Sequence, residues 1–208
     1  MNIEGRVGAI SAEEGTENPL TTTKEGSLYV NQSSGKYTEA VRVGRVFVAA
    51  NQAAVALTAA MATTYTGLVL FNPATSLKNL VLLQFGYALT VALPTAATVI
   101  GLMTGTVVTA ATMDAATAIT PRNRLVGSAN TSSAIVDNGC TLNGTPVLEQ
   151  VFSQVGTLAT TGSQVNPPNV IDIDGSLILK PGSYVAAYSF AANTACALFS
   201  FMWEEIDV

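Results

Sequence analysis

The sequence contains no histidine, only two cysteines and few charged residues. Histidine is the commonest general base near neutral pH and the commonest metal ligand, so its absence excludes Ser-His and Cys-His nucleophilic sites within this chain. Cys140 and Cys196 cannot form a four-ligand structural zinc site without histidines. We expect both to be buried reduced thiols, because free cysteine is among the most buried residue types, although their spacing leaves a disulfide open.

Charge is scarce and its balance is acidic. Charged residues make up 11% of the 208 residues, against about a quarter in an average soluble chain. The 9 lysines and arginines against 14 aspartates and glutamates give a net charge of -5, which argues against a basic nucleic-acid-binding surface. A mean hydropathy of +0.39 excludes a disordered acidic tail, and the length fits one domain with an arm.

Apolar runs of membrane-spanning length are also missing. The longest uncharged stretch, residues 79–113, is interrupted by Gln84, Gly86, Pro94 and Gly101, so no run of about 20 predominantly apolar residues remains. The first 25 residues carry five glutamates and no apolar core, which is unlike a secretory signal. We therefore expect no membrane segment.

The charges that are present gather near the N-terminus. The first 45 residues hold 11 of the 23 charges, whereas residues 46–121 hold only Lys78 and Asp114. The segment through Gly35 is rich in Gly, Ser, Thr, Asn and Glu and shows little apolar period. We predict an extended N-terminal arm over residues 1–26, held in place by a neighbouring molecule, and a β-sandwich domain over residues 27–208.

The body has the composition of an all-β domain. Short segments rich in β-branched, leucine and aromatic residues are separated by turn formers such as Asn72-Pro73 and Pro181-Gly182. Roughly nine or ten short strands at such spacing predict an antiparallel sandwich or barrel. The predicted strands are residues 27–31, 40–48, 67–72, 79–93, 106–110, 125–127 or 135–136, 147–151, 177–179, 184–190 and 195–206.

Two segments are less regular. Residues 49–61 are rich in alanine, which favours a helix by propensity, but their lack of a polar face also suits a buried strand or loop. We predict a strand there and a single helical turn at residues 114–118. Within residues 40–48, Val41 and Val43 lie apart from Arg42, and Gly44 marks a predicted bulge.

Such low charge raises the question of how the surface stays soluble. A surface free of apolar patches carries about 25 to 35% charged residues, whereas this chain has 30 alanines and 26 threonines. We infer that much of the outer surface of residues 46–121 and of the C-terminal strands is covered by identical subunits or partner proteins. The alternative is a monomer with a surface rich in Thr, Ser and Asn.

Two aspartates are the first candidates for chemistry. Asp172 and Asp174 alternate with Ile171 and Ile173, which places both carboxylates on one face of a strand about 7 Å apart. That spacing suits acid/base catalysis or a calcium ion, but the oxygen and glutamate ligands of a calcium-binding EF-hand loop are missing. We interpret the pair as the solvated end of a strand that leads into a turn at Gly175.

Further charged groups lie at the C-terminus and near the middle of the chain. Alternation places Trp203 with Glu205 on one strand face, and Glu204 on the other, with Asp207 following. A glycosidase needs two carboxylates about 5 to 9.5 Å apart beside a cleft, but an acidic edge that prevents strand pairing explains these residues more simply. The basic pair is Arg122 and Arg124, which is too small for nucleic acid; an ion pair with Glu13, Glu14 and Glu17 of the arm is a hypothesis.

The order of several phrases carries a resemblance. These are SLYV, SGKYTEAVRVGRVFVAANQ, TYTGLVLFNPATSLKNLVLLQFGYAL and LILKPGSYVAAYSFAANTACALFSFMWEEID. Together they resemble uncharacterised virion proteins of tailed bacteriophages, over about residues 27–208 and without a catalytic motif. The resemblance implies a jelly-roll-like β-sandwich that forms homotrimers and belongs to the capsid surface, spike, neck or tail, with the major capsid protein or other virion proteins as partners.

Three functions therefore stay open. The first is a non-enzymatic virion structural protein, located in the virion, with no cofactor and no catalytic or metal site. The second is a receptor- or glycan-binding adhesin, which needs exposed aromatic rings. The third is an enzyme built on Asp172 and Asp174. The aromatic residues available to an adhesin, which we expect to lie mostly in the core or an interface, are Tyr65, Tyr87, Tyr184, Tyr188 and Trp203.

Overall fold

The computed structural model describes residues 35–57, 64–89, 98–106, 117–142, 144–155 and 169–208. The predicted arm, residues 1–26, and the predicted strand at residues 27–31 lie outside these ranges. The segment Ala40–Val208 forms one compact unit. The described elements begin with the helix α1 (Thr38–Arg42). The strands that follow are β1 (Val46–Ala50), β2 (Val55–Leu57), β3 (Thr64–Asn72), β4 (Lys78–Leu89), β5 (Thr98–Thr106), β6 (Thr117–Ala118), β7 (Arg122–Asn123), β8 (Ile135–Thr141), β9 (Val147–Val155), β10 (Asn169–Leu179), β11 (Ser183–Ser189) and β12 (Asn193–Asp207).

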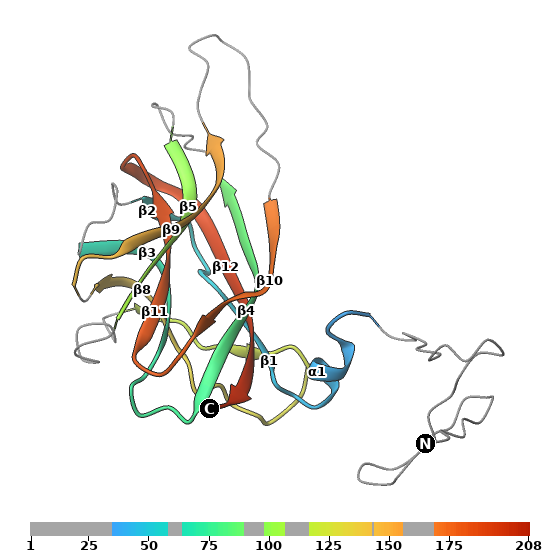
Figure 1. Ribbon diagram of the computed structural model, residues 1–208. Coiled ribbons are helices and arrows are strands. Elements are labelled where there is room, and N and C mark those ends of the chain that lie inside the picture. Colours follow the sequence, from blue (N-terminus) through green and yellow to red (C-terminus); the bar gives the residue numbers. More distant parts are fainter. Residues whose placement is uncertain (1–34, 58–63, 90–97, 107–116, 143, 156–168) are drawn as a thin grey trace, which may run out of the picture. The chain divides into compact units, whose positions relative to one another are not determined.

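The strands form two antiparallel sheets that pack as a sandwich, as predicted (Figure 1). The first sheet has the order β10-β4-β12-β1-β7, with β2 paired to β12, and the second has the order β6-β8-β3-β11-β5-β9. Eight of these strands pair in a nested way: β1 with β12, β3 with β11, β4 with β10 and β5 with β9. A chain folded back on itself in this manner across two sheets is a jelly roll.

Aromatic side chains fill the space between the sheets. Phe85 of β4 lies at the centre, with its ring centroid 5.9 Å from that of Phe199 and 5.4 Å from that of Phe201 on β12. Phe152 of β9, in the opposite sheet, lies 5.5 Å from the same ring. Trp203 is fully buried in this core and stacks on Phe47. Burial of such large rings contributes most of the stability of a sandwich of this size.

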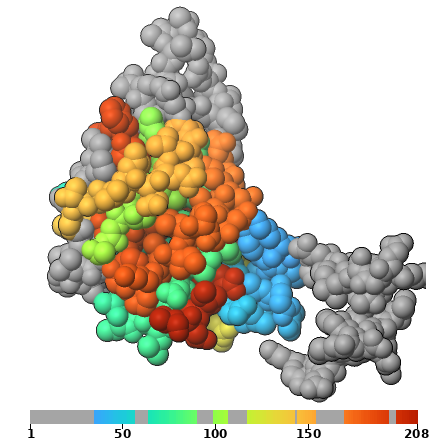
Figure 2. Space-filling view, in the orientation of Figure 1, coloured from blue at the N-terminus to red at the C-terminus, as the bar shows by residue number. Residues whose placement is uncertain are grey.

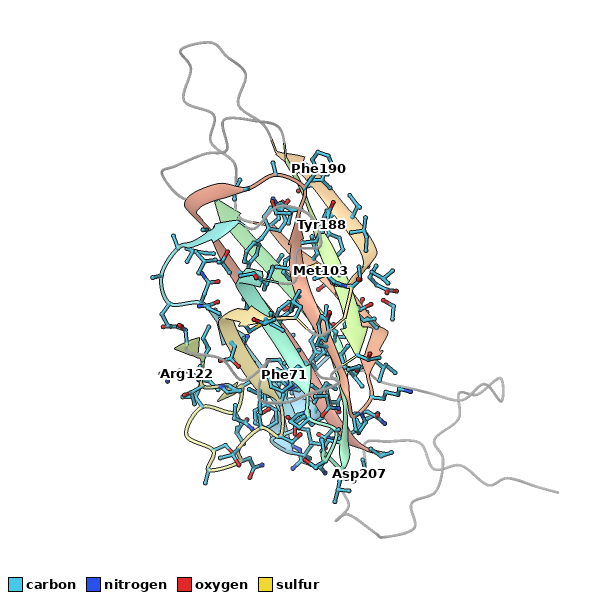
Figure 3. The ribbon with its side chains drawn as sticks, turned by 90° about the vertical axis from the view of Figure 1, so that its left-hand side faces the viewer. Phe71, Met103, Arg122, Tyr188, Phe190 and Asp207 are labelled. Carbon is cyan, nitrogen blue, oxygen red and sulfur yellow. The ribbon has the colours of Figure 1, made fainter. Side chains whose placement is uncertain are left out.

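The second sheet is apolar on both of its faces. Along β3, Leu68 and Leu70 face the core between the sheets, whereas Val69 and Phe71 belong to a separate buried cluster on the outer face. Figure 3 shows Phe71, Met103 and Tyr188 on this outer face. A sheet that is buried on both faces has near-continuous apolar strands, which explains the unbroken GLVLF phrase of β3.

The prediction for residues 40–48 is only partly correct, because the strand starts at Val46 and the preceding residues form helix α1. The amide of Arg45 donates to the carbonyl of Ala40, and the amide of Gly44 donates to that of Val41. This is the Schellman pattern that ends a helix, with Gly44 at a φ of 72°. The glycine therefore caps a helix, and the predicted bulge at this position is wrong.

Other local predictions are confirmed or corrected as follows. The strand predicted over residues 49–61 is partly correct: the end of β1 and all of β2 lie there, but residues 51–54 between them are not strand, and residues 58–61 lie outside the described ranges. The predicted helical turn at residues 114–118 is wrong for its last two residues, which form β6. A strand was predicted at either residues 125–127 or residues 135–136, and the structure has it at the second position, as part of β8. Strand β5 was not predicted over residues 98–105.

Candidate functional site

Asp172 and Asp174 are both exposed on β10, and Ile173 between them is buried, as the alternation predicted. Asp172 accepts a hydrogen bond of 2.7 Å from the amide nitrogen of Gln84 on β4. Asp174 and Gly175 have φ values of 55° and 78°, at an irregularity where the pairing of β10 with β4 slips. The strand continues beyond this bulge to Leu179, so the two aspartates lie within an edge strand and not at its end.

The C-terminal acidic residues do not protect a sheet edge, and that prediction is wrong. Strand β12 lies inside the first sheet, between β4 and β1. Asp207 lies 2.5 Å from the ammonium of Lys78, and Glu204 lies 3.1 Å from the guanidinium of Arg45. The hydrogen bond and the charge of Lys78 lower the pKa of Asp207 below its usual value. These two pairs join the end of β12 to its neighbours.

Glu205 is buried, with 6% of its surface exposed, and shares a strand face with Trp203 as predicted. Its carboxylate accepts hydrogen bonds from the hydroxyls of Ser132 and Ser133 at 2.5 and 2.9 Å, and from the amide of Ser133 at 3.0 Å. The indole nitrogen of Trp203 lies at 3.4 Å. The carboxylate thus fixes the segment before β8 to the last strand of the fold.

The five aromatic residues that an adhesin would expose are all buried, as expected for core positions. Tyr65 donates a hydrogen bond to the carbonyl of Ala187. Tyr87 donates to the hydroxyl of Ser153 on β9 and accepts from the side chain of Asn169 on β10. Tyr87 therefore links the two sheets near the edge formed by β9 and β10.

Cys140 is free and buried on the outer face of the second sheet, which confirms the prediction of a reduced thiol at this position. Nothing is described of the side chain of Cys196. Burial raises the pKa of Cys140 to about 12, with the charge of Asp137 acting in the same direction. Burial also raises the pKa of Tyr184 to about 12 and that of Tyr65 well above its usual value.

Arg122 and Arg124 lie at the margin of the first sheet that is opposite to β10. Arg122 is on the two-residue strand β7, and Arg124 follows just after it. Both are exposed, and Figure 3 shows Arg122 at the periphery of the molecule. Asn123 between them points inward, donates to the carbonyl of Gly44 at 2.7 Å and accepts from the amide of Leu125 at 2.8 Å. Within the described residues neither arginine forms an ion pair.

A cavity of about 700 Å³ lies beside Arg122, where the short strands β6 and β7 end the two sheets. Its volume is within the range of small-molecule and peptide-binding pockets. Amide and hydroxyl groups alternate with small apolar side chains around it. Its lining includes Gln52, Val55, Thr66, Thr117, Thr120 and Asn138.

The other edge of the sandwich is apolar, and the sequence analysis did not identify it. Val147 and Val151 of β9 are 63% and 53% exposed, and Leu148 is also exposed. On β10, Val170 is 67% and Ile178 is 53% exposed. We refer to these five residues as the apolar edge; Figure 2 shows β9 and β10 on the side turned toward the viewer.

Comparison of the chain with family models, curated proteins and solved structures gave no match. Among the residues that the structure describes, no group of three or more Cys, Asp and Glu side chains is arranged to hold a metal ion. The one described helix is too short to span a bilayer. Two surface features of the described residues are therefore candidates for function: the apolar edge and the cavity beside Arg122.

Proposed function

We propose that this protein is a non-enzymatic structural component of a bacteriophage virion, such as a capsid decoration protein, a spike or a neck or tail component. It associates with copies of itself, with a trimer favoured, and attaches to the particle through its N-terminal arm. The sequence resemblance supports the virion setting. The observation that supports self-association is the apolar edge.

The four sheet edges differ in how they are protected. Soluble proteins prevent edge-to-edge pairing with short strands, bulges or charged residues. Strands β6 and β7 are two residues long, and β10 carries a bulge with Asp172 and Asp174. Strand β9 is nine residues long and carries Glu149 as its one charge. Its exposed Val147, Leu148 and Val151 are the pattern of a surface that another protein molecule covers.

The experiment that tests this proposal is the oligomer mass of two variants, measured by size-exclusion chromatography with light scattering. Val151→Lys places a charge in the apolar edge, and we expect it to reduce the mass toward one chain. Leu77→Lys, at a residue that is 80% exposed between β3 and β4, is the matched control and leaves the mass of the wild type unchanged. An unchanged mass for Val151→Lys would contradict self-association through this edge.

A further inference from the structure

We infer that Arg122 and Arg124 bind the acidic segment around Glu13, Glu14 and Glu17 in the arm of a second copy of this chain. This inference rests on the proposed function, because it names the surface on which the arm is held. It uses a different part of the sandwich from the apolar edge. The two interfaces therefore make separate predictions.

The arginines are positioned for an external partner. Asn123 turns toward the carbonyl of Gly44, whereas Arg122 and Arg124 on either side of it are exposed to solvent. An extended acidic segment can place one carboxylate at each of these two exposed guanidinium groups. Each guanidinium can donate two hydrogen bonds to one carboxylate, and this bidentate arrangement is the strongest form of the contact.

The described acidic residues nearby in the first sheet already have partners. Glu204 pairs with Arg45, Asp207 pairs with Lys78, and Glu205 is buried among serines. The two arginines are thus left with a positive charge that no described residue of their own sheet neutralises. A partner with unpaired carboxylates would complement the positive charge of these two arginines.

The cavity beside Arg122 can accommodate an extended segment of a second copy. Strand β7 pairs with β1 on one side, and β6 pairs with β8 on one side, so both have a free edge at this margin. The threonine hydroxyls and the Gln52 and Asn138 amides around the cavity can bond to peptide groups of a bound segment. The side-chain amide oxygen of Asn138 is buried and has no hydrogen-bond partner among the described residues.

The arm has the required chemistry. Residues 1–34 contain five glutamates against one arginine and one lysine, and the densest group is the SAEEGTEN phrase of residues 11–18. The residues between and before these glutamates, Ser11, Ala12, Gly15 and Thr16, have small side chains. A polar segment of this kind becomes ordered when it binds a neighbouring copy, and its contacts then add to the binding free energy of the assembly.

Charge reversal and complementation in the full-length protein test this inference. The dissociation constant of the oligomer is measured by analytical ultracentrifugation. We expect Arg122→Glu/Arg124→Glu to weaken association about tenfold or more, and Glu13→Lys/Glu14→Lys to do the same. Leu77→Glu, at an exposed residue between β3 and β4, is the control for an added negative surface charge and leaves association unchanged.

Mixing the two defective variants identifies the copy to which the arm belongs. In an equal mixture, the Glu arm of one variant meets the intact arginines of the other, so association is restored only if the arm binds a second copy. Restoration in a single chain carrying all four changes, but not in the mixture, would show binding within one chain and overturn the inference.

Other outcomes separate this inference from the proposed function. A wild-type monomer would refute the proposed function itself. A stable wild-type oligomer that Arg122→Glu/Arg124→Glu leaves unchanged would refute the inference alone. Loss of binding to an acidic glycan in that variant, with unchanged association, would assign the arginines to an adhesin site and would also overturn it.

Discussion

At the scale of single residues, tyrosine rings occupy the space above glycines on the outer face of the second sheet. Tyr184 and Gly105 are direct cross-strand partners on β11 and β5. A β-carbon at Gly105 would lie 2.5 Å from the ring of Tyr184, and one at Gly67 would lie within 2.5 Å of the ring of Tyr65. Tyr65 and Gly67 lie on the same strand, β3, whereas the ring of Tyr184 over a glycine of the neighbouring strand protects the backbone and fixes the register.

Gly105→Ala tests this arrangement. We expect it to lower the free energy of unfolding by about 1–3 kcal/mol, because the ring has to leave a fully buried position. In a Tyr184→Leu background the same substitution should cost much less, since no ring occupies the space above the glycine. Urea denaturation of the four proteins of this cycle gives the coupling directly. An equal cost in both backgrounds would show that the ring is not the cause.

The buried carboxylate of Glu205 is a second residue whose replacement gives a clear result. Glu205→Gln places an amide where the carboxylate accepts from Ser132, Ser133 and Trp203, so at least one buried donor loses its acceptor. We expect a loss of about 2–3 kcal/mol in unfolding free energy. Glu204→Gln, which breaks only the partly exposed pair with Arg45, is the control and should cost less than about 1 kcal/mol. Equal losses in chemical denaturation would refute the assignment.

At the scale of elements, most strands of the sandwich were predictable from the sequence. The prediction failed where glycines interrupt a strand and where a helix has the valine spacing of a strand. Strands β3, β11 and β12 were predictable because apolar residues on both faces make each of them a near-continuous apolar run. Strand β5 was missed, since Gly101 and Gly105 read as breaks, whereas Gly101 lies against the backbone of Gln150 and Gly105 lies beneath a tyrosine. Helix α1 was missed because Val41 within it and Val43 just after it have the spacing of a strand.

The functional surfaces were less predictable than the strands. The arginine pair was identified from the sequence because charge is rare in this part of the chain. The apolar edge was not, because its valines and leucine are indistinguishable in sequence from core residues such as Leu68 and Val185. Only the strand order, which places β9 at the end of its sheet, shows that they are exposed.

The outer cluster of the second sheet predicts a loss of stability at alkaline pH. Burial raises the pKa of Cys140 and of Tyr184 to about 12, above the ordinary values of 9.0 and 10.0, and raises that of Tyr65 as well. The folded state therefore holds these protons more tightly than the unfolded state. Stability is fully present below pH 9 and is lost as the pH rises toward 12.

Tyr65→Phe provides the check on this pH dependence. Phenylalanine cannot ionise, so the slope of unfolding free energy against pH between about 10 and 12 should be smaller in the variant, even though the hydrogen bond to Ala187 is lost. Urea denaturation across this pH range gives the slopes. A slope identical to that of the wild type would exclude Tyr65 as a contributor.

At the scale of the whole molecule, few charges, an apolar edge and an acidic arm are three features of one design. On the proposed function, other protein molecules cover part of the surface of this weakly charged sandwich, and the arm extends the contact beyond the sandwich itself. We expect deletion of residues 1–26 to leave the sandwich folded, with an unchanged near-ultraviolet circular dichroism spectrum, but to abolish attachment to the larger assembly. Retained attachment would remove the arm from this account.

The molar mass of the full-length wild-type protein, followed by light scattering over a hundredfold dilution, tests the central claim most directly. The account predicts a mass that stays at a small multiple of the 21.4 kDa chain, with three chains favoured. A mass of one chain at every concentration, for a protein that remains soluble and folded, would contradict it.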